Sequence, residues 1–261
     1  MRINDKREIK RPKLSVIMSV FNESKTLEKS IKSILNQKFQ NFEFIILNDG
    51  SIDSSEKIIK KHCKKNKKIL HIYSEKNRGL TFMLNLGIKY ARGEYIVRHD
   101  ADDYSFKNRL YKQFLFMEKN KNIYILGTNS RDYIKNNKKF KISQMPTDSK
   151  TIKEGLIKKN HLIHSSLIIR KKFFKKVGLY NPQFLKCQDY ELWLRGRGRF
   201  EYTNLKDVMI TRNIDKSKFK FLDLYLVLKA KLMHSKRPRD VFFAIFSSFK
   251  DLFVKILNFL I

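Results

Sequence analysis

The first hundred residues alternate between short apolar runs and amphipathic stretches, and this alternation restricts the fold more than any other feature. The apolar runs predict strands at Leu14–Val20, Phe42–Leu47, Ile69–Tyr73 and Glu94–Val97. Apolar residues at helical spacing predict helices after Ser24, at Asp53–Lys65 and at Leu80–Ala91. Strand–helix–strand units with short polar links predict an α/β protein whose mostly parallel sheet is flanked by helices.

The pattern loosens after residue 103 but continues to about residue 215. Further helices are predicted at Phe106–Lys119, Thr147–Lys158, Lys171–Val177 and Gln188–Arg195. Further strands are predicted at Ile123–Ile134 and His164–Ile169. We therefore expect one domain over residues 12–215, followed by a helical C-terminal extension over residues 216–261.

Three carboxylates stand within four positions shortly after the strand predicted at Glu94–Val97: Asp100, Asp102 and Asp103. Such a cluster is costly unless a cation lies among its members, and acids are scarce in a chain with 57 Lys and Arg, 25 Asp and Glu and a net charge of +32. Carboxylate oxygens are ligands that Mn²⁺ and Mg²⁺ prefer, and ligands of open α/β sheets bind at the carboxyl ends of the strands. The pattern predicts a divalent-metal site at this edge of the sheet. The alternative is a solvated surface loop.

The positive charge is spread along the whole chain rather than gathered in one segment. No lysine cluster is interleaved with aromatic residues in the manner of a base-stacking surface, so we rank a nucleic-acid partner below an anionic membrane surface. The two cysteines, Cys63 and Cys187, have neither disulfide nor zinc-site spacing, which favours a reducing compartment. We therefore expect a cytoplasmic protein.

The last twenty residues predict an amphipathic helix. From Val241 onward apolar residues recur at helical spacing, and Ser247, Asp251 and Lys255 mark the opposite face. Basic residues precede it at Lys229, Lys231, Lys236, Arg237 and Arg239. A broad apolar face beside basic residues is typical of helices at the interface of an anionic bilayer, so we expect peripheral attachment to the inner face of the cell membrane. Packing on the domain or on a second copy would give the same pattern, and the oligomeric state stays open.

Several short motifs together resemble the family 2 glycosyltransferases of the GT-A fold, over about residues 12–212. The motifs are Leu14–Glu23, Ser33–Gln37, Ile46–Asp53, Asn77–Leu80, Asn85–Gly87, Gly93–Ile96 and Asp100–Asp103. Their order and spacing make chance a poor explanation. The resemblance implies a Rossmann-like GT-A sheet, a nucleotide-diphosphate-sugar donor, a divalent metal (Mn²⁺ or Mg²⁺) and, as in most members, inversion at the anomeric carbon.

The resemblance also implies which residues bind the donor. These residues are Val20, Asn22, Glu23, Asp49, Arg78 and Gly79. The first three line the donor pocket, and Asp49 accepts a hydrogen bond from a uracil-type base. Arg78 and Gly79 precede a helix, whose N-terminus suits an anion. Each of these segments is also compatible with an ordinary turn.

Among the acids, the resemblance assigns Asp102 to the metal, and Asp100 to the ribose and to the hydration shell of the metal. Asp103 either caps the next helix or binds the donor sugar. Many relatives carry a histidine after the last core strand that completes the metal shell, whereas this chain has Thr211–Asp215 without one. Asn213, Asp215 or water would take that place, and Arg212 would neutralise the diphosphate.

The segment Gln188–Arg195 resembles a family segment that begins Glu-Asp-Tyr, with Gln188 in place of the usual Glu. The resemblance makes Asp189 the general base that deprotonates the acceptor hydroxyl, a role suited to a carboxylate whose pKa is raised by a partly apolar site. A helix cap is the structural alternative for Asp189. His164 and Trp193 are expected on the acceptor side, although a lone histidine is more often structural.

Together these expectations describe a metal-dependent, inverting glycosyltransferase of the hexosyltransferase type. It would move a sugar from a UDP-linked donor to a hydroxyl of a glycan or lipid-linked acceptor in surface-polysaccharide or lipo-oligosaccharide synthesis. The alternatives are a GT-A relative that binds nucleotide without transfer, and a basic nucleic-acid-binding protein suggested only by the charge. The motifs do not determine the sugar, the acceptor or the linkage.

Overall fold

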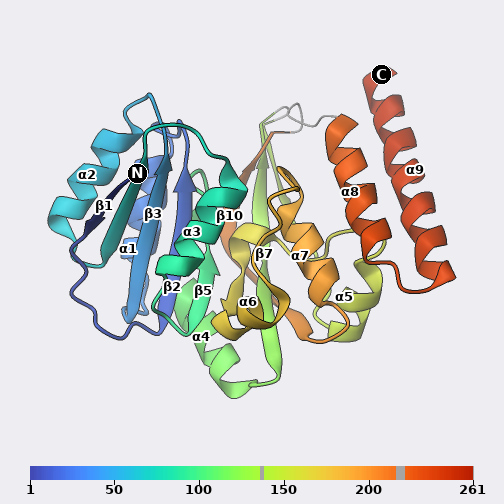
Figure 1. The fold of residues 1–261 in the computed structure, drawn as a ribbon, viewed down its shortest axis with the longest axis horizontal. Coiled ribbons are helices and arrows are strands. Elements are labelled where there is room, and N and C mark those ends of the chain that lie inside the picture. Colours follow the sequence, from blue (N-terminus) through green and yellow to red (C-terminus); the bar gives the residue numbers. More distant parts are fainter. Residues whose placement is uncertain (136–137, 216–220, 261) are drawn as a thin grey trace.

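The computed structural model describes residues 1–135, 138–215 and 221–260. One large sheet runs through the molecule, with helices on both of its faces (Figure 1). The strands are β1 Arg2–Asp5, β2 Leu14–Val20, β3 Phe42–Asp49, β4 Ile69–Ser74, β5 Tyr95–Arg98, β6 Tyr104–Ser105, β7 Ile123–Ile134, β8 Lys139–Ile142, β9 Ile168–Arg170 and β10 Glu201–Ile214. The helices are α1 Leu27–Leu35, α2 Ser55–Lys65, α3 Leu80–Tyr90, α4 Arg109–Lys119, α5 Ser149–Gly155, the 3₁₀ turn η1 His164–Ser166, α6 Lys171–Val177, α7 Gln188–Gly196, α8 Phe221–Met233 and α9 Pro238–Leu260.

The strands follow the order β1-β4-β3-β2-β5-β9-β7-β10-β6, and β8 pairs with β7. Strands β4, β3, β2 and β5 are parallel to one another, as are β7 and β10. Strands β1, β6 and β9 pair antiparallel with their neighbours. The predicted α/β class, with a mostly parallel central sheet between helices, is confirmed.

Within the residues that it describes, the structure adds four strands, β1, β6, β8 and β10, to those predicted, and one predicted strand differs. The segment Arg2–Asp5 pairs with β4, although its exposed side chains give no apolar signal. The strand predicted at His164–Ile169 is instead the turn η1 followed by the short β9. The Oγ of Ser166 donates to the carbonyl of Ile163 at 2.8 Å and accepts from the N–H of Thr128 at 3.1 Å. A side chain therefore replaces the strand ladder at this point.

Buried apolar clusters cover both faces of the sheet. One cluster includes residues of α3, α6 and α7, and the other includes residues of α1, α2 and α4. Gly87 lets α3 approach the sheet, because a Cβ at this position would lie 2.7 Å from Cγ2 of Ile17. With both faces covered, the strand ends are the part of the central sheet that remains open to a ligand.

The C-terminal helices pack on the rest of the chain, with α8 against α7 and α9 against α8 (Figure 1). Buried Glu191 of α7 lies 2.9 Å from Nε2 of His234, and Arg197 pairs with Asp240 at 2.7 Å. The predicted division between residues 215 and 216 borders residues 216–220, which lie outside the described residues, and it stays a prediction. None of the helices in the described part of the chain combines the length and apolar composition needed to cross a membrane.

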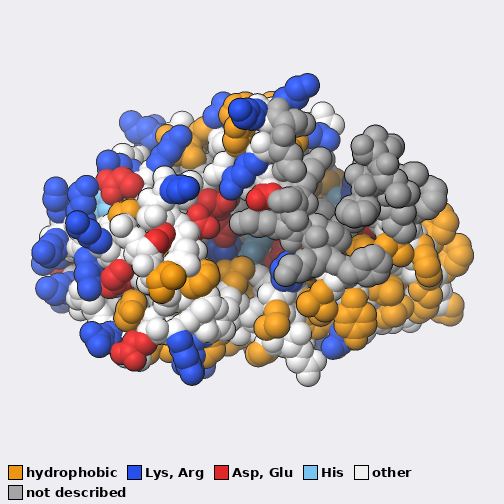
Figure 2. All heavy atoms as spheres, turned by 90° about the horizontal axis from the view of Figure 1, so that it is seen from above, with side chains coloured by type: hydrophobic (Ala, Val, Ile, Leu, Met, Phe, Trp, Pro, Cys, Tyr) orange, Lys and Arg blue, Asp and Glu red, His pale blue; other side chains and the backbone are white. Residues whose placement is uncertain are grey.

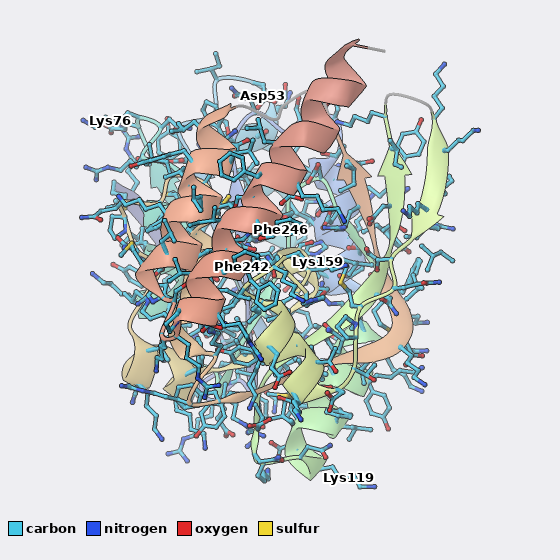
Figure 3. All side chains as sticks on the ribbon, turned by 90° about the vertical axis from the view of Figure 1, so that its right-hand side faces the viewer. Asp53, Lys76, Lys119, Lys159, Phe242 and Phe246 are labelled. Carbon is cyan, nitrogen blue, oxygen red and sulfur yellow. The ribbon has the colours of Figure 1, made fainter. Side chains whose placement is uncertain are left out.

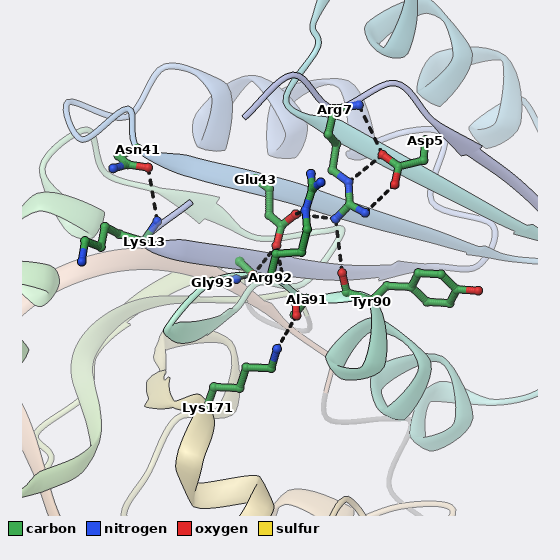
Figure 4. Close-up of polar contacts among 11 residues, drawn as sticks. Asp5, Arg7, Lys13, Asn41, Glu43, Tyr90, Ala91, Arg92, Gly93 and Lys171 are labelled. Carbon is green, nitrogen blue, oxygen red and sulfur yellow. Dashed lines mark hydrogen bonds and ion pairs between the residues drawn. The ribbon is translucent and has the colours of Figure 1, made fainter. Parts of the chain in front are cut away.

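A buried ion cluster lies where β2 and β3 begin (Figure 4). Glu43 is fully buried and accepts hydrogen bonds from the Oγ of Ser15 and the N–H of Arg92, both at 2.6 Å. Its second oxygen pairs with Arg7, whose guanidinium also binds both carboxylate oxygens of Asp5. A buried carboxylate needs several donors because its desolvation costs several kcal/mol. The cluster therefore ties the N-terminal segment to the start of the central strands.

Replacing Glu43 with Ala is expected to lower the free energy of unfolding by about 3–5 kcal/mol, because Arg7 and Arg92 lose a buried partner. Urea unfolding followed by circular dichroism measures this change. The control is Glu75→Ala, which breaks an exposed pair with Arg2 at 3.4 Å and is expected to cost less than about 1 kcal/mol. Equal losses in the two variants would contradict the role given to the cluster.

Candidate functional site

The loops after β2 and β3 are joined by hydrogen bonds at the carboxyl edge of the sheet. The N–H of Asn22 donates to the Oγ of Ser51 at 3.0 Å, and the Oδ1 of Asn22 accepts from the N–H of Ile52 at 2.9 Å. Asn22 has a φ of 54°, a conformation that Asn tolerates better than most residues. Of the predicted donor residues in this loop, Val20 is buried, Asn22 is exposed and Glu23 is half-buried.

Asp49, at the end of β3, binds the backbone that begins α3. Its Oδ1 accepts from the N–H of Arg78 at 2.7 Å and its Oδ2 from the N–H of Gly79 at 2.9 Å. Gly79 has a φ of 88°, which favours glycine. The exposed guanidinium of Arg78 lies over the ring of Phe82, 4.6 Å from its centroid. Asp49 therefore fixes the two other predicted donor residues, and each of its oxygens retains a lone pair for a ligand.

The acids after β5 form a turn in which the N–H of Asp103 donates to the carbonyl of Asp100 at 3.2 Å. Asn213 of β10 donates to the carbonyl of Asp102 at 2.6 Å. Burial, with the charges of Asp100 and Glu23, raises the pKa of Asp102 to about 6. Burial and the charges of Asp100 and Asp102 raise the pKa of Asp103 well above its usual range. Figure 2 shows acidic side chains gathered near the middle of this edge.

Two buried arginines lie close to the acids, and the sequence analysis did not identify them. The Nη2 of Arg98, the last residue of β5, pairs with Oδ1 of Asp100. Arg109 of α4 donates to Ser105 at 2.8 Å and to Gln113 at 3.1 Å, and burial lowers its pKa to about 9. The chain therefore supplies part of the positive charge that the acids require. The sequence signal for Arg98 was an arginine at the end of an apolar strand. This signal did not stand out because basic residues are abundant in the sequence.

Asp189 lies in the first turn of α7, half-buried. Its Oδ2 accepts from the Nδ2 of Asn160 at 3.2 Å, and Asn160 is itself fixed because its Oδ1 accepts from the N–H of Leu162 at 3.0 Å. Burial raises the pKa of Asp189, and the charge of Asp100 adds to this shift. The structure therefore brings Asp189 near the acids after β5. Asn160 was not predicted.

His164 and Trp193 lie on the same side of the sheet as Asp189, but in different surroundings. The Nε2 of His164 shares a hydrogen bond of 2.8 Å with the hydroxyl of Tyr180. Burial and the charge of Arg98 lower the pKa of His164 well below its usual range, so the ring is neutral at pH 7. Trp193 is fully buried, 6.1 Å from His164 between ring centroids. Trp193 is therefore enclosed and packs against His164 and Phe173 rather than facing a ligand.

Arg212 of β10 is held in an ion pair with Asp132 of β7. Its Nε and Nη2 donate to the two carboxylate oxygens of Asp132 at 2.9 and 2.7 Å. This pair joins the two parallel strands beside the acids. The expected contact of Arg212 with a diphosphate stays a prediction, since it would have to be made alongside the pair with Asp132.

The residues at this edge fit a metal that arrives with a phosphate ligand. In the described part of the chain, no three His, Cys, Asp or Glu residues are arranged to hold an ion by themselves. Asp100 and Asp102 nevertheless supply hard oxygen donors, and the buried Oδ2 of Asp103 accepts no hydrogen bond from the described residues. Mg²⁺ commonly binds one or two protein carboxylates and completes its shell with water and phosphate oxygens.

Comparison with known proteins gives clear relatives for the chain. Residues 15–178 match the family described as Glycosyl transferase family 2. The chain is 36% identical over 197 residues to the uncharacterized glycosyltransferase MJ1057 of Methanocaldococcus jannaschii, which covers 72% of this chain and 66% of that protein. It is 30% identical over 214 residues to the putative glycosyltransferase EpsE of Bacillus subtilis, covering 80% of this chain and 76% of that protein.

Solved structures share the fold at low sequence identity. S. aureus TarS 1–349 has a TM-score of 0.72 at 17% identity, covering 91% of this chain and 72% of that one. Its complex with UDP-GlcNAc has a TM-score of 0.67 at 17% identity, covering 84% and 66%. The mannosyltransferase PcManGT of Pyrobaculum calidifontis, in complex with GDP-Man and Mn²⁺, has a TM-score of 0.62 at 13% identity, covering 91% and 74%. The matched residues and these relatives show that the chain belongs to glycosyltransferase family 2 and has the GT-A fold.

Proposed function

We propose that this protein transfers a sugar from a UDP-linked donor to a hydroxyl group of a glycan or lipid-linked acceptor, with inversion at the anomeric carbon. The acceptor would belong to the synthesis of a surface polysaccharide or lipo-oligosaccharide. The observation that carries the proposal is that α7, which bears Asp189, and the end of β5 flank the same turn η1: Trp193 of α7 packs on His164 at 6.1 Å between ring centroids, and the N–H of Arg98 donates to the carbonyl of Leu167 at 3.0 Å. A base for the acceptor and the candidate donor residues therefore belong to one site.

Donor binding would use the loops that follow β2 and β3. Asp49 retains lone pairs that can accept a hydrogen bond from a nucleobase, while it holds the backbone of Arg78 and Gly79 in place. The N-terminus of α3 begins directly after these two residues, where the helix dipole favours a phosphate group. The complexes of TarS with UDP-GlcNAc and of PcManGT with GDP-Man support a nucleotide-sugar donor.

A divalent ion, Mn²⁺ or Mg²⁺, would when bound offset the negative charge that grows on the departing diphosphate. Asp102 is the first candidate ligand, because its half-buried carboxylate is repelled by Asp100 and Glu23 and a cation would relieve that repulsion. Asp100 is the second candidate. The Mn²⁺ bound to PcManGT supports a metal in this fold.

Asp189 would accept the proton of the acceptor hydroxyl while the hydroxyl oxygen attacks the anomeric carbon. The new carbon–oxygen bond forms on the face opposite the diphosphate, the bond to the phosphate oxygen breaks, and the configuration inverts. Asn160 holds one oxygen of Asp189 by a hydrogen bond, which leaves the other oxygen for the proton. Asn160 would therefore orient the base without touching the substrate.

Replacing Asp189 with Asn is expected to lower kcat by at least about 100-fold and to leave the affinity for UDP unchanged, because the base is separate from the donor loops. In the parent enzyme, the base acts only when it is ionised, so activity should fall as the pH drops through the pKa of Asp189. Burial raises that pKa above 3.8, the usual value for Asp, so the fall should occur at a pH above 3.8. Steady-state transfer assays over a pH series, with UDP calorimetry, measure both effects.

The control is Asp207→Asn, which changes an exposed carboxylate paired with Lys112 and should leave kcat unchanged. Normal turnover in Asp189→Asn would contradict the assignment of the base. A parent enzyme that binds UDP but turns over no donor would favour the transfer-inactive alternative. That alternative is motivated by the segment Thr211–Asp215, which contains no histidine.

We also propose that the enzyme works at the inner face of the cell membrane, attached through the outer surface of α8 and α9. Over residues 242–249 the apolar face of α9 points outward: Phe242, Phe246 and Phe249 are 63%, 60% and 63% exposed. Figure 3 labels the first two on α9, and Figure 2 shows hydrophobic side chains gathered at this end of the molecule. The other face points inward, where buried Lys231 of α8 donates to the hydroxyl of Ser247 at 2.8 Å.

The charges beside this surface favour anionic lipid over a second copy of the chain. Of the acids on the two helices, Asp223 and Asp240 are paired with Lys186 and Arg197, and Asp251 of α9 is exposed. Exposed basic side chains lie beside the apolar face at Lys236, Arg237, Arg239 and Lys250. A two-fold dimer through this surface would bring these cations close to the same cations of the second chain, where they would repel one another. Anionic lipid headgroups would instead neutralise them.

Changing Phe242, Phe246 and Phe249 together to Ser is expected to reduce binding to vesicles of phosphatidylcholine and phosphatidylglycerol at least tenfold, because a buried Phe contributes roughly 1.5–3 kcal/mol. Vesicle co-sedimentation measures the effect. The control changes Ile52 and Ile142 to Ser; these side chains are 92% and 58% exposed, in the loop after β3 and in β8. Equal binding by the two variants, or a dimer in light scattering that only the triple variant loses, would contradict the lipid assignment.

A further inference from the structure

Arg98 is a buried cation beside the candidate donor site to which the proposed reaction gives no role. It ends β5 and is only 2% exposed. Its charge lowers the pKa of His164 and opposes the rise in the pKa of Tyr180 caused by burial. Its guanidinium is therefore paired with Asp100 and lies close enough to His164 and Tyr180 for its charge to act on both.

The contacts of Arg98 hold its guanidinium in one position. Its Nη1 donates to the carbonyl of Ile17 in β2 at 3.3 Å and to the carbonyl of His99. Its Nη2 pairs with Oδ1 of Asp100. The Nε is buried and has no acceptor among the described residues. A planar group fixed by two backbone carbonyls can orient the carboxylate that it binds.

This contact occupies one oxygen of Asp100 and leaves the other available. The three carboxylates stand in one short turn, in which the N–H of Asp103 donates to the carbonyl of Asp100 at 3.2 Å, so their negative charges repel one another. Without Arg98, the side chain of Asp100 would lose its partner and turn away from its neighbours. Arg109, the second buried arginine near the acids, is bound to Ser105, Gln113 and the carbonyl of Arg98, and none of its hydrogen bonds in the described structure is to a carboxylate.

We propose that Arg98 is a positioning residue that holds Asp100 in place for the nucleotide and leaves Asp102 to meet the metal. The free oxygen of Asp100 then accepts a hydrogen bond from a hydroxyl of the ribose, the part of a nucleoside diphosphate that offers such donors. This inference rests on the proposed binding of a nucleotide-sugar donor. In this arrangement Arg98 holds Asp100 in place, whereas Asp102 stays open to the metal.

This difference between Asp100 and Asp102 predicts that replacing Arg98 changes the affinities for UDP and for Mn²⁺ in opposite directions. Arg98→Gln is expected to weaken UDP binding about tenfold, measured by calorimetry in EDTA, because Asp100 loses its charge-assisted hydrogen bond and its orientation. The same variant is expected to bind Mn²⁺ alone at least about twofold more tightly, measured by electron paramagnetic resonance, because a positive charge beside the acids is gone. Arg98→Lys should recover part of the UDP affinity, since it keeps the charge but not the planar fork.

The control is Arg170→Gln. Arg170 is also buried and binds backbone carbonyls and the hydroxyl of Tyr95, away from the acids. It should lose thermal stability and keep the parent affinity for both ligands. If Arg98→Gln does not fold, Arg98→Lys carries the test, with UDP affinity expected below that of the parent.

Unchanged UDP affinity in the Arg98 variants would overturn the positioning role, and so would a parallel loss of UDP and Mn²⁺ affinity, which general damage to the site would produce. A parent protein that binds no UDP, with or without Mn²⁺, would instead overturn the proposed function. The failure of the positioning role is therefore distinguishable from the failure of the proposed reaction.

Discussion

The arrangement of the candidate site depends on repulsion among carboxylates that the fold gathers at one edge of its sheet. Asp100, Asp102 and Asp103 follow β5 directly, and α7 brings Asp189 near them. Burial makes the ionised forms costly, which is why the pKa values of Asp102, Asp103 and Asp189 are all raised. A large net positive charge spread over the surface does little for buried acids. Local cations must stabilise these acids, and Arg98 is paired with Asp100.

The same edge is held by hydrogen bonds that leave little freedom to its loops. Asn22 joins the loops after β2 and β3, Asp49 fixes the start of α3, and Asn213 holds the carbonyl of Asp102. These contacts come from side chains of three different segments. A site assembled in this way can present its carboxylates in fixed positions before a ligand arrives, which lowers the cost of binding.

Much of this arrangement could be predicted from the sequence, and the part that could not depends on distant contacts. Leu14–Val20 and Phe42–Leu47 were identifiable as strands because helices cover both faces of the central sheet, so their residues are mostly apolar. The acids stood out because acids are rare in this chain. Asn160 could not be found, because its bond to Asp189 joins residues 29 positions apart.

The C-terminal helix shows the same limit. Its periodicity predicted α9, but not which of its faces points inward, because that depends on the contact between Lys231 and Ser247 from different helices. The apolar face that amphipathic patterning would normally bury is the exposed one. The polar contacts of α8 and α9 with each other and with the domain fix this orientation.

The most direct test of the account is a calorimetric titration of the full chain with UDP, in Mn²⁺ and in EDTA, repeated for Asp102→Asn. We expect the parent protein to bind UDP more tightly in Mn²⁺, because the metal would join Asp102 to the diphosphate. We expect Asp102→Asn to lose that advantage while keeping the weaker binding seen in EDTA. Equal affinity in Mn²⁺ and EDTA for both proteins would contradict a metal-dependent nucleotide-sugar site at the carboxyl edge of the sheet.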